Sequence, residues 1–258
     1  MDIKLIVTDL DNTLLRRDKS LSDYTLSIIG QCRTKGILIA FATARSERDK
    51  GPFSDQVTPD IFISNNGALA RRGSEMLFTS LLPADAAHEL IQKCREEPRI
   101  LTIRLETENE VYANSTVNPT IGDIGVTVIT DFAQDVDYSN SYKISIRCND
   151  ENVPAAIARK FPAIDIIGYR EENFFTFRSR EASKENALFA IAGLLGINMG
   201  NIAAFGDDVS DIGMLKASGI AVAVENAVPA VKAAAEYICG DCDEDGVARW
   251  IEANLLGA

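Results

Sequence analysis

The chain has 258 residues, 46% of them hydrophobic and 25% charged, a composition typical of a folded protein with one large core or two smaller ones. Its 26 basic and 38 acidic residues give a formal charge of −12, so a general affinity for nucleic acid is not expected. The sequence starts without a signal peptide and has no apolar stretch near the ~20 residues that cross a bilayer, so we expect no membrane association. The five cysteines, an odd number, are predicted to be free thiols in a reducing cytoplasm. No pattern indicates an oligomeric state.

The N-terminal part of the chain alternates apolar runs with helical patterns. The apolar runs are nearly continuous, which is typical of strands buried on both faces of a parallel sheet. Ser22 suits the N-cap of the first helix, and Gly36 suits the position just past its end. A short polar helix is expected from Ser46, and the sequence Asn65-Asn66-Gly67 predicts a turn after the third strand. We expect strands at 3–8, 37–42 and 60–64 and a helix at 22–35.

The C-terminal part shows the same alternation. Strands that alternate with helices form a doubly wound sheet. The two ends of the chain therefore predict one Rossmann-like α/β core with a parallel sheet. Pro229 suits the first turn of one of its helices. We expect strands at 202–205 and 220–224 and helices at 183–195, 210–217, 229–236 and 246–255.

The middle of the chain has a different pattern. Longer strands with polar alternation, combined with helices, indicate an α+β domain. We therefore predict that residues 83–180 form an inserted domain, and that residues 1–82 and 181–258 together form the core domain. We expect strands at 100–112, 143–147 and 165–177 and helices at 84–97 and 153–161.

The strongest chemical signal is the sequence Asp9-Leu10-Asp11-Asn12-Thr13, directly after the first predicted strand. Ligands of open α/β sheets bind beyond the carboxyl ends of the strands. Two residues along an extended chain span ~6–7 Å, so Asp9 and Asp11 can both face one substrate and one cation. The alternative interpretation is a polar turn after a strand, because the same residue types suit turns.

A second acidic cluster, residues 206–211, follows another predicted strand and contains Asp207, Asp208 and Asp211. Clustered carboxylates repel one another unless a cation lies among them, and hard oxygen ligands of this kind suit Mg²⁺. The alternative is an acidic helix N-terminus, which the helix dipole favours without any metal.

Two further segments could bind phosphate. Thr43, Ala44 and Arg45 follow the second predicted strand and offer a hydroxyl, backbone N–H groups and a guanidinium, all of which suit phosphate oxygens. A helix cap followed by a surface arginine has the same sequence. Lys184 lies at a predicted helix start, where the dipole disfavours a cation, so its position suggests a function. A solvated lysine is the alternative.

In this order, the segments resemble the motifs of the haloacid dehalogenase superfamily, and within it the Cof-type phosphatases, which carry a large cap domain inserted into the core. The turn at 65–67 and the sequence at 244–247 are also similar to that subfamily. Ala44 departs from the glycine often found there, and Ser210 from the usual asparagine, but neither change removes a carboxylate. The four motifs are matched by Asp9–Thr13, by Thr43, by Lys184, and by Gly206-Asp207 with Asp211.

The resemblance implies a Mg²⁺-dependent phosphatase that acts on a small phosphorylated metabolite, most commonly a sugar phosphate. Asp9 would attack phosphorus and form an aspartyl phosphate, and Asp11 would be the general acid and base. The implied metal ligands are Asp9, the Asp11 carbonyl, Asp207 and, directly or through water, Asp211. The implied phosphate-binding residues are Leu10, Thr43, Ala44, Arg45 and Lys184.

Two other functions stay open at this point. One is a phosphotransferase or phosphomutase that shares the nucleophile, and the other is a metabolite-binding protein without turnover. The presence of Asp9, Asp11, Lys184 and Asp207 favours an enzyme over the binding protein. The single histidine, His88, disfavours a histidine-based triad.

Residues 241–252 also match the calcium-loop pattern D-x-[DN]-x-[DN]-G-x5-E in full. The match stands alone, Arg249 occupies a ligand position, and residues 237–239 suggest a strand where a long helix would be required. We therefore interpret the segment as a solvated turn before the last helix.

Overall fold

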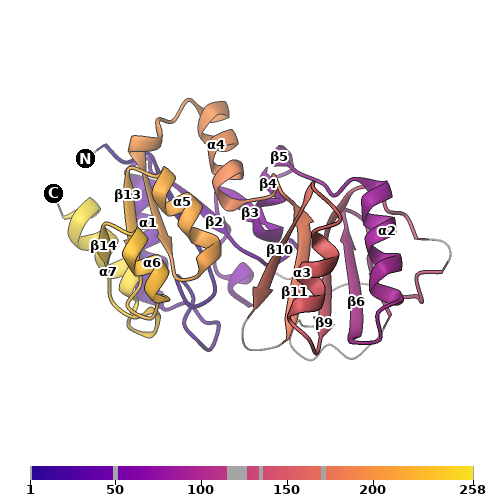
Figure 1. The fold of residues 1–258 in the computed structure, drawn as a ribbon. Coiled ribbons are helices and arrows are strands. Elements are labelled where there is room, and N and C mark those ends of the chain that lie inside the picture. The colour runs from indigo at the N-terminus through magenta and orange to yellow at the C-terminus, as the bar shows by residue number, and fades with distance from the viewer. Residues whose placement is uncertain (1, 49–51, 115–126, 134–135, 170–172, 258) are drawn as a thin grey trace. The chain divides into compact units, whose positions relative to one another are not determined.

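The computed structural model describes residues 2–48, 52–114, 127–133, 136–169 and 173–257. These residues form two compact units (Figure 1), which are Met1–Thr79 with Ser183–Ala258, and Ser80–Ala182. We call the first the core unit and the second the inserted unit. Each has its own hydrophobic cluster. Among the residues described, no helix has the length and apolar character needed to cross a membrane.

The core unit is built on an eight-stranded sheet. Its strands are β1 (Leu5–Thr8), β2 (Leu38–Ala42), β3 (Ile61–Ser64), β4 (Leu69–Arg72), β5 (Glu75–Thr79), β12 (Ile202–Gly206), β13 (Ile220–Ala223) and β14 (Tyr237–Ile238). The spatial order is β14-β13-β12-β1-β2-β3-β4-β5, parallel as far as β3 and antiparallel at β4 and β5. β1 pairs with β2 on one side and with β12 on the other, which makes the end of β1 a topological switch point.

Helices pack on this sheet in two groups. The core helices are α1 (Asp23–Thr34), α4 (Lys184–Leu195), α5 (Ile212–Ala217), α6 (Pro229–Ala234) and α7 (Gly246–Ile251). α5 contacts both α4 and α6, whereas α1 contacts α7. In Figure 1, α5 and α6 lie in front of the sheet and α1 lies behind it. The predicted doubly wound α/β core is therefore confirmed.

Local signals explain where the two longest core helices begin. Ser22 caps α1 by accepting a hydrogen bond from the Thr25 amide, and Ser183 caps α4 in the same way through Asn186. Gly196, in the left-handed conformation, ends α4. The Ser183 cap matters for the site because it places Lys184 in the first turn.

Two parts of the core differ from the sequence-based expectation. Residues 46–48 are not helical, so the helix predicted from Ser46 is wrong there, and a short 3₁₀ helix forms instead at Pro52–Asp55. A proline inside a helical pattern usually ends the helix, so Pro52 limits how far a helix from Ser46 could extend. β4 and β5 form an unpredicted hairpin around Gly73, which has a φ of +58°.

The inserted unit has a six-stranded sheet with the order β10-β11-β9-β6-β7-β8. Its elements are α2 (Ala84–Arg95), β6 (Ile100–Thr107), β7 (Val111–Ala113), β8 (Thr127–Ile129), β9 (Ser141–Cys148), α3 (Asn152–Ala158), β10 (Ile164–Tyr169) and β11 (Phe174–Ser179). Apolar side chains of α2 and α3, such as Leu90 and Ile157, share a hydrophobic cluster with Leu105 and Ile144 of the sheet. One face of the sheet therefore packs on its helices.

Two predicted strands of the inserted unit are each two strands. The segment 100–112 divides into β6 and β7 because Thr107 and Glu110 close a turn, with Thr107 N 2.9 Å from the Glu110 carbonyl oxygen. The segment 165–177 divides into the antiparallel strands β10 and β11. The units separate after Thr79 and Ala182, whereas the sequence placed the edges after residues 82 and 180. That the inserted unit acts as a cap stays a prediction.

Candidate active site

Three neighbouring parallel strands bring the predicted site residues to one edge of the core sheet. Asp9 follows β1, Thr43 follows β2, and Asp207 follows the last residue of β12. Since β1 pairs with both other strands, their carboxyl ends lie side by side at the switch point. Lys184 reaches the same place from the first turn of α4, as its contacts show.

The ammonium of Lys184 lies between two carboxylates. Its Nζ is 2.6 Å from Asp9 Oδ1 and 2.6 Å from Asp211 Oδ1. All three side chains are withdrawn from solvent, because Asp9 is 7% exposed, Lys184 2% and Asp211 0%. A buried cation at a helix start is unfavourable by itself, so these two anions are what stabilise it.

The pKa values of two carboxyls in this cluster, Asp9 and Asp207, are raised. Burial raises the pKa of Asp9 well above its ordinary value, Lys184 opposes the shift, and Asp211 and Asp207 add to it. Burial and then the charge of Asp211 raise the pKa of Asp207 to about 7. Burial alone would lower the pKa of Lys184, but the charges of Asp211 and Asp9 outweigh it and raise this pKa. One lysine therefore does not balance the negative charge of the cluster.

Asp211 is fixed on both of its oxygens. Oδ1 accepts from Lys184, and Oδ2 accepts from the Asp207 and Asp208 amides at 3.0 Å each. Gly206 permits this closeness, because a Cβ at that position would lie 2.5 Å from the Asp211 Cβ. Asp211 thus shapes the loop that carries Asp207.

The same carboxylates fit a divalent cation. One oxygen from each of Asp9, Asp207 and Asp211 lies within 4.8 Å of the others. Thr13 donates from its hydroxyl to Asp207 Oδ1 at 2.7 Å, which orients that carboxylate. Hard carboxylate oxygens are the donors that Mg²⁺ prefers, and a cation would relieve the repulsion between these three groups.

Asp11 has different partners from Asp9. Arg45 binds it with two bonds, Nε to Oδ2 at 2.7 Å and Nη2 to Oδ1 at 2.6 Å, and Lys19 Nζ lies 2.9 Å from Oδ1. Partial burial opposes the effect, but Arg45 and then Lys19 hold the pKa of Asp11 below its ordinary value. In this arrangement Asp11 is a carboxylate, and the Arg45 guanidinium is directed at it.

The loop after β2 is built around Thr43, whose hydroxyl oxygen accepts from the Arg45 amide at 3.1 Å. The turn at 65–67 braces it, because the Asn66 amide donates to the Thr43 carbonyl at 3.0 Å. Gly67, with a φ of +89°, lies so close to Ser183 that a Cβ would be 2.1 Å from the Ser183 carbonyl carbon. The turn therefore joins the Thr43 loop to the start of α4, a relationship the sequence did not reveal.

Leu10 and Ala44 are the two predicted phosphate-binding residues that would act through the backbone. The Leu10 side chain is fully buried, so only its backbone could contact a phosphate. Ala44 lies between Thr43 and Arg45 in the same loop. The roles of these residues stay predictions.

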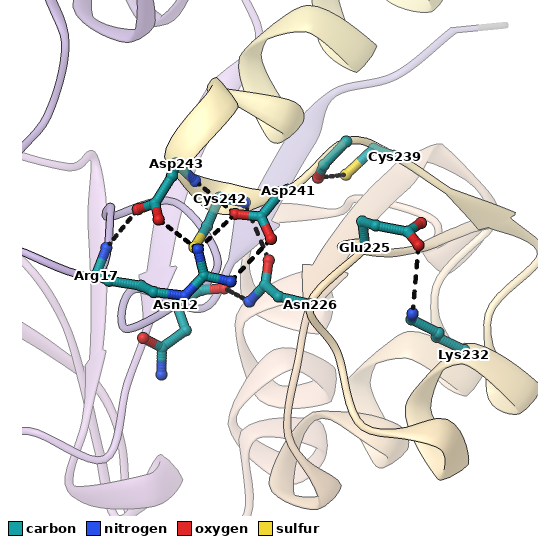
Figure 2. A network of polar contacts seen from close by, with 10 residues as sticks. Asn12, Arg17, Glu225, Asn226, Lys232, Cys239, Asp241, Cys242 and Asp243 are labelled. Atoms are coloured by element: carbon teal, nitrogen blue, oxygen red, sulfur yellow. Dashed lines mark hydrogen bonds and ion pairs between the residues drawn. The ribbon is translucent and has the colours of Figure 1, made fainter.

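The acids of the calcium-like segment, residues 241–252, bind arginine side chains. Arg17 Nη1 and Nη2 bind Asp241 Oδ1 and Oδ2 at 2.8 Å each, and Arg17 also contacts Asp243 (Figure 2). Asp245 binds Arg16 at 2.9 Å. A guanidinium thus lies where a cation would bind, which supports a turn and not a calcium loop. The turn was predicted to be solvated, whereas its acids pair with Arg16 and Arg17. The strand predicted at 237–239 is confirmed by β14.

Comparison with known proteins identifies the family. The sequence profile of the haloacid dehalogenase-like hydrolases matches residues 6–251, so the chain belongs to this family. The family match and the relatives described next, which are named phosphatases, identify it as an enzyme of the phosphatase class.

Two similar proteins of Bacillus subtilis (strain 168) are named 5-amino-6-(5-phospho-D-ribitylamino)uracil phosphatases. YitU is 27% identical over 269 residues, which cover 96% of this chain and 96% of YitU. YcsE is 26% identical over 262 residues, which cover 99% of this chain and 97% of YcsE.

Solved structures show the same fold. A sugar phosphatase of HAD subclass IIB has a TM-score of 0.83 at 22% identity, covering 97% of this chain and 98% of its own. A HAD phosphatase from Bacteroides thetaiotaomicron has a TM-score of 0.84 at 24% identity, covering 97% and 94%.

Proposed function

We propose that this chain is a Mg²⁺-dependent phosphomonoesterase that acts on a small phosphorylated metabolite, such as a sugar phosphate, through an aspartyl phosphate on Asp9. The observation that carries the proposal is the buried contact of Lys184 with Asp9 and Asp211 beside Asp207, at the switch point of the sheet. The names of the relatives and the shared fold with a sugar phosphatase support the substrate class. A cytoplasmic setting stays a prediction.

The chemistry follows from the order of the groups. Asp9 attacks phosphorus, and the bond from phosphorus to the leaving oxygen breaks as the bond to Asp9 forms. Asp11 gives a proton to the leaving oxygen and later takes one from the attacking water. That water displaces Asp9 and releases inorganic phosphate. Lys184 orients Asp9 throughout and offsets the charge of the phosphate oxygens.

The proposed Mg²⁺ site uses four residues of the core unit. The carboxylates of Asp9 and Asp207, the Asp11 carbonyl and Asp211 would hold Mg²⁺, which when bound neutralises charge on the transferring phosphoryl group. Because both Asp211 oxygens already accept bonds from the protein, we assign Asp211 a contact through water.

Arg45 connects substrate binding to proton transfer. In the structure it forms a two-bond pair with Asp11, and its guanidinium also lies 5.8 Å from the centre of the Phe53 ring. A phosphate oxygen would compete for the guanidinium, because planar bidentate pairing suits both anions. Transfer of Arg45 to the phosphate would remove the main charge that lowers the pKa of Asp11, so Asp11 could take up a proton from water and then act as the acid.

The inserted unit would bind the part of the substrate beyond the phosphate. One face of its sheet is charged, with Arg104 3.3 Å and Lys143 3.5 Å from Glu106 Oε1. Arg178 stands opposite Lys143 in the neighbouring strand and lies 3.4 Å from Asp165. Polar groups on a rigid sheet can bind hydroxyls or charges of a leaving group, which the core residues do not distinguish.

The test is hydrolysis of a generic aryl phosphate with and without Mg²⁺. Wild-type protein should release phosphate only with the metal. Asp9→Asn keeps the shape but removes the attacking charge, so turnover should fall to background. Asp23→Asn, an exposed acid in the first turn of α1, is the matched control and should match wild type. Substantial activity of Asp9→Asn would exclude Asp9 as the nucleophile.

A further inference from the structure

A side chain from far along the sequence holds the backbone of the nucleophile loop. Asn226 Nδ2 donates to the Asn12 carbonyl oxygen at 2.7 Å. Asn12 lies one residue after Asp11 and has a φ of +60°, in the left-handed region, which asparagine tolerates better than most residues other than glycine. This conformation turns the chain after Asp9 and Asp11, so the bond acts on the turn of the nucleophile loop.

The carbonyl oxygen of the Asn226 side chain also forms a hydrogen bond. The Cys242 amide donates to Asn226 Oδ1 at 3.0 Å, so one end of the side chain donates and the other accepts (Figure 2). The two partners define the amide orientation, because the reverse orientation would place two acceptors and two donors face to face. Cys242 is buried and belongs to the loop whose Asp241 and Asp243 bind Arg17. Asn226 therefore ties Asn12 to an anchored segment.

The loop that carries Asn226 also contacts the second acidic loop. The Val228 amide donates to the Asp207 carbonyl at 3.0 Å. Asp207 in turn accepts from the Thr13 hydroxyl at 2.7 Å, one residue after Asn12. Residues 226–228 thus connect the two segments that carry the nucleophile and the predicted metal ligand, through bonds to the backbone carbonyls of Asn12 and Asp207.

We infer that Asn226 is a positioning residue for the phosphatase reaction, which fixes the Asn12 carbonyl and thereby holds Asp9 and Asp11 in the arrangement they need before substrate binds. The inference rests on the proposed function. Asp9 and the Asp11 carbonyl are implied metal ligands, and removal of an outer partner that orients metal ligands typically costs ~10–100-fold in activity or metal affinity. A displacement of ~1 Å in a reacting group has an effect of similar size.

Two substitutions of Asn226 test whether its bonds position the nucleophile loop or whether its side chain only fills space. Asn226→Asp keeps the size and the acceptor for Cys242 but places a carboxylate oxygen against the Asn12 carbonyl. Asn226→Ala removes both bonds. The matched control is Glu225→Gln, which changes the preceding residue and weakens only an exposed pair with Lys232, 3.8 Å away.

Each variant is measured in two ways. Steady-state kinetics with an aryl phosphate and Mg²⁺ gives kcat and KM separately. Hydrogen exchange in Mg²⁺-free protein reports on the Leu14 and Leu15 amides, which bond to the Asp9 and Leu10 carbonyls at 3.3 and 2.8 Å. The exchange measurement requires neither metal nor substrate. Circular dichroism checks folding first, and Asn226→Ser replaces Asn226→Asp if the latter is unfolded.

In both Asn226 variants kcat should fall ~10–100-fold, while KM changes by less than ~3-fold. Exchange at the two amides should accelerate ~10-fold or more, because the loop opens more often. Glu225→Gln should match wild type in both measurements. Unchanged kcat, or a lower kcat with unchanged amide exchange, overturns the inference. If wild-type protein has no phosphatase activity, the proposed function fails, and the exchange result alone then decides whether Asn226 holds the loop.

Discussion

Lys184 Nζ lies 2.6 Å from Oδ1 of Asp9, although the two residues are 175 positions apart in the sequence. Both side chains are buried, and Lys184 forms an equally short contact with Asp211. A buried lysine stays charged in such a place only if its anionic partners offset the loss of solvation. The charge balance of the site therefore depends strongly on this one side chain.

Replacement of Lys184 by methionine should impair stability and activity together. It leaves Asp9 and Asp211 buried without their cation, and removal of one partner from a buried pair typically costs ~3–5 kcal/mol of unfolding free energy. Urea unfolding of Mg²⁺-free protein at pH 7 measures this loss, and added Mg²⁺ should recover part of it. Lys216→Met, at an exposed position of α5, is the control. Equal unfolding free energies for the two variants would contradict the assigned charge balance.

Protons and Mg²⁺ should compete at Asp207. Its pKa, about 7, is raised by burial and the charge of Asp211. Below pH 7 the carboxyl is largely protonated, so the apparent Mg²⁺ affinity should increase between pH 6 and pH 8, with proton release on binding. Calorimetry in buffers of different ionisation enthalpy measures both. An affinity independent of pH over this range would contradict a role for Asp207 as ligand.

The same raised pKa has a consequence for folding without metal. In the unfolded chain the pKa of an aspartate is ~3.9. Between about pH 4 and pH 7 the folded state therefore binds more protons than the unfolded state. The contribution of Asp207 to the unfolding free energy should therefore decrease as pH rises through that window. Asp207→Asn should flatten this part of the pH profile of Mg²⁺-free unfolding.

Asp11→Asn should affect substrates unequally. The variant loses proton transfer to the leaving oxygen, which is worth ~10²–10⁴-fold when the leaving group is a poor one. An alkyl phosphate needs that proton, whereas an activated aryl phosphate departs without it. Turnover of the alkyl ester should therefore fall much further. Equal losses on the two substrates would contradict the acid role of Asp11.

Deletion of the inserted unit should separate specificity from chemistry. The hydrophobic cluster of the core unit contains no residue of the segment 80–182, so a Gly/Ser linker from Thr79 to Ser183 should leave a folded core, which circular dichroism can check. Turnover of the natural metabolite should collapse, while slow Mg²⁺-dependent hydrolysis of a small activated ester should remain. A folded core that keeps the original substrate preference would show that specificity lies outside the inserted unit.

The sequence predicted which residues lie together at the strand ends, because the geometry of a parallel sheet determines where those ends lie. Asp9, Thr43 and Asp207 each follow a buried strand, and strand adjacency alone brings them together. The pairing of Arg45 with Asp11 could not be predicted, since it depends on the conformations of two loops. Nothing in the sequence relates Asn226 to Asn12, because their contact is between a side chain and a backbone carbonyl.

The fold was predictable for similar reasons, with clear exceptions. Buried strands have continuous apolar sequences, whereas β4 and the edge strand β5 contain Arg71, Arg72 and Glu75, which obscure their alternation. The glycine between them was the available turn signal. The polar residues after Arg45 suggested a helix, but local propensity did not account for the proline that follows.

The most direct test of the mechanism is to trap the covalent intermediate. The enzyme would be mixed with an aryl phosphate and Mg²⁺, quenched in acid during turnover, and treated with borohydride, which reduces an acyl phosphate to an alcohol. Mass spectrometry of the N-terminal peptide should then show homoserine at position 9, and the conversion should disappear without Mg²⁺ and in Asp9→Asn. Steady turnover with unmodified Asp9, or with the modification at another residue, would contradict an aspartyl phosphate on Asp9.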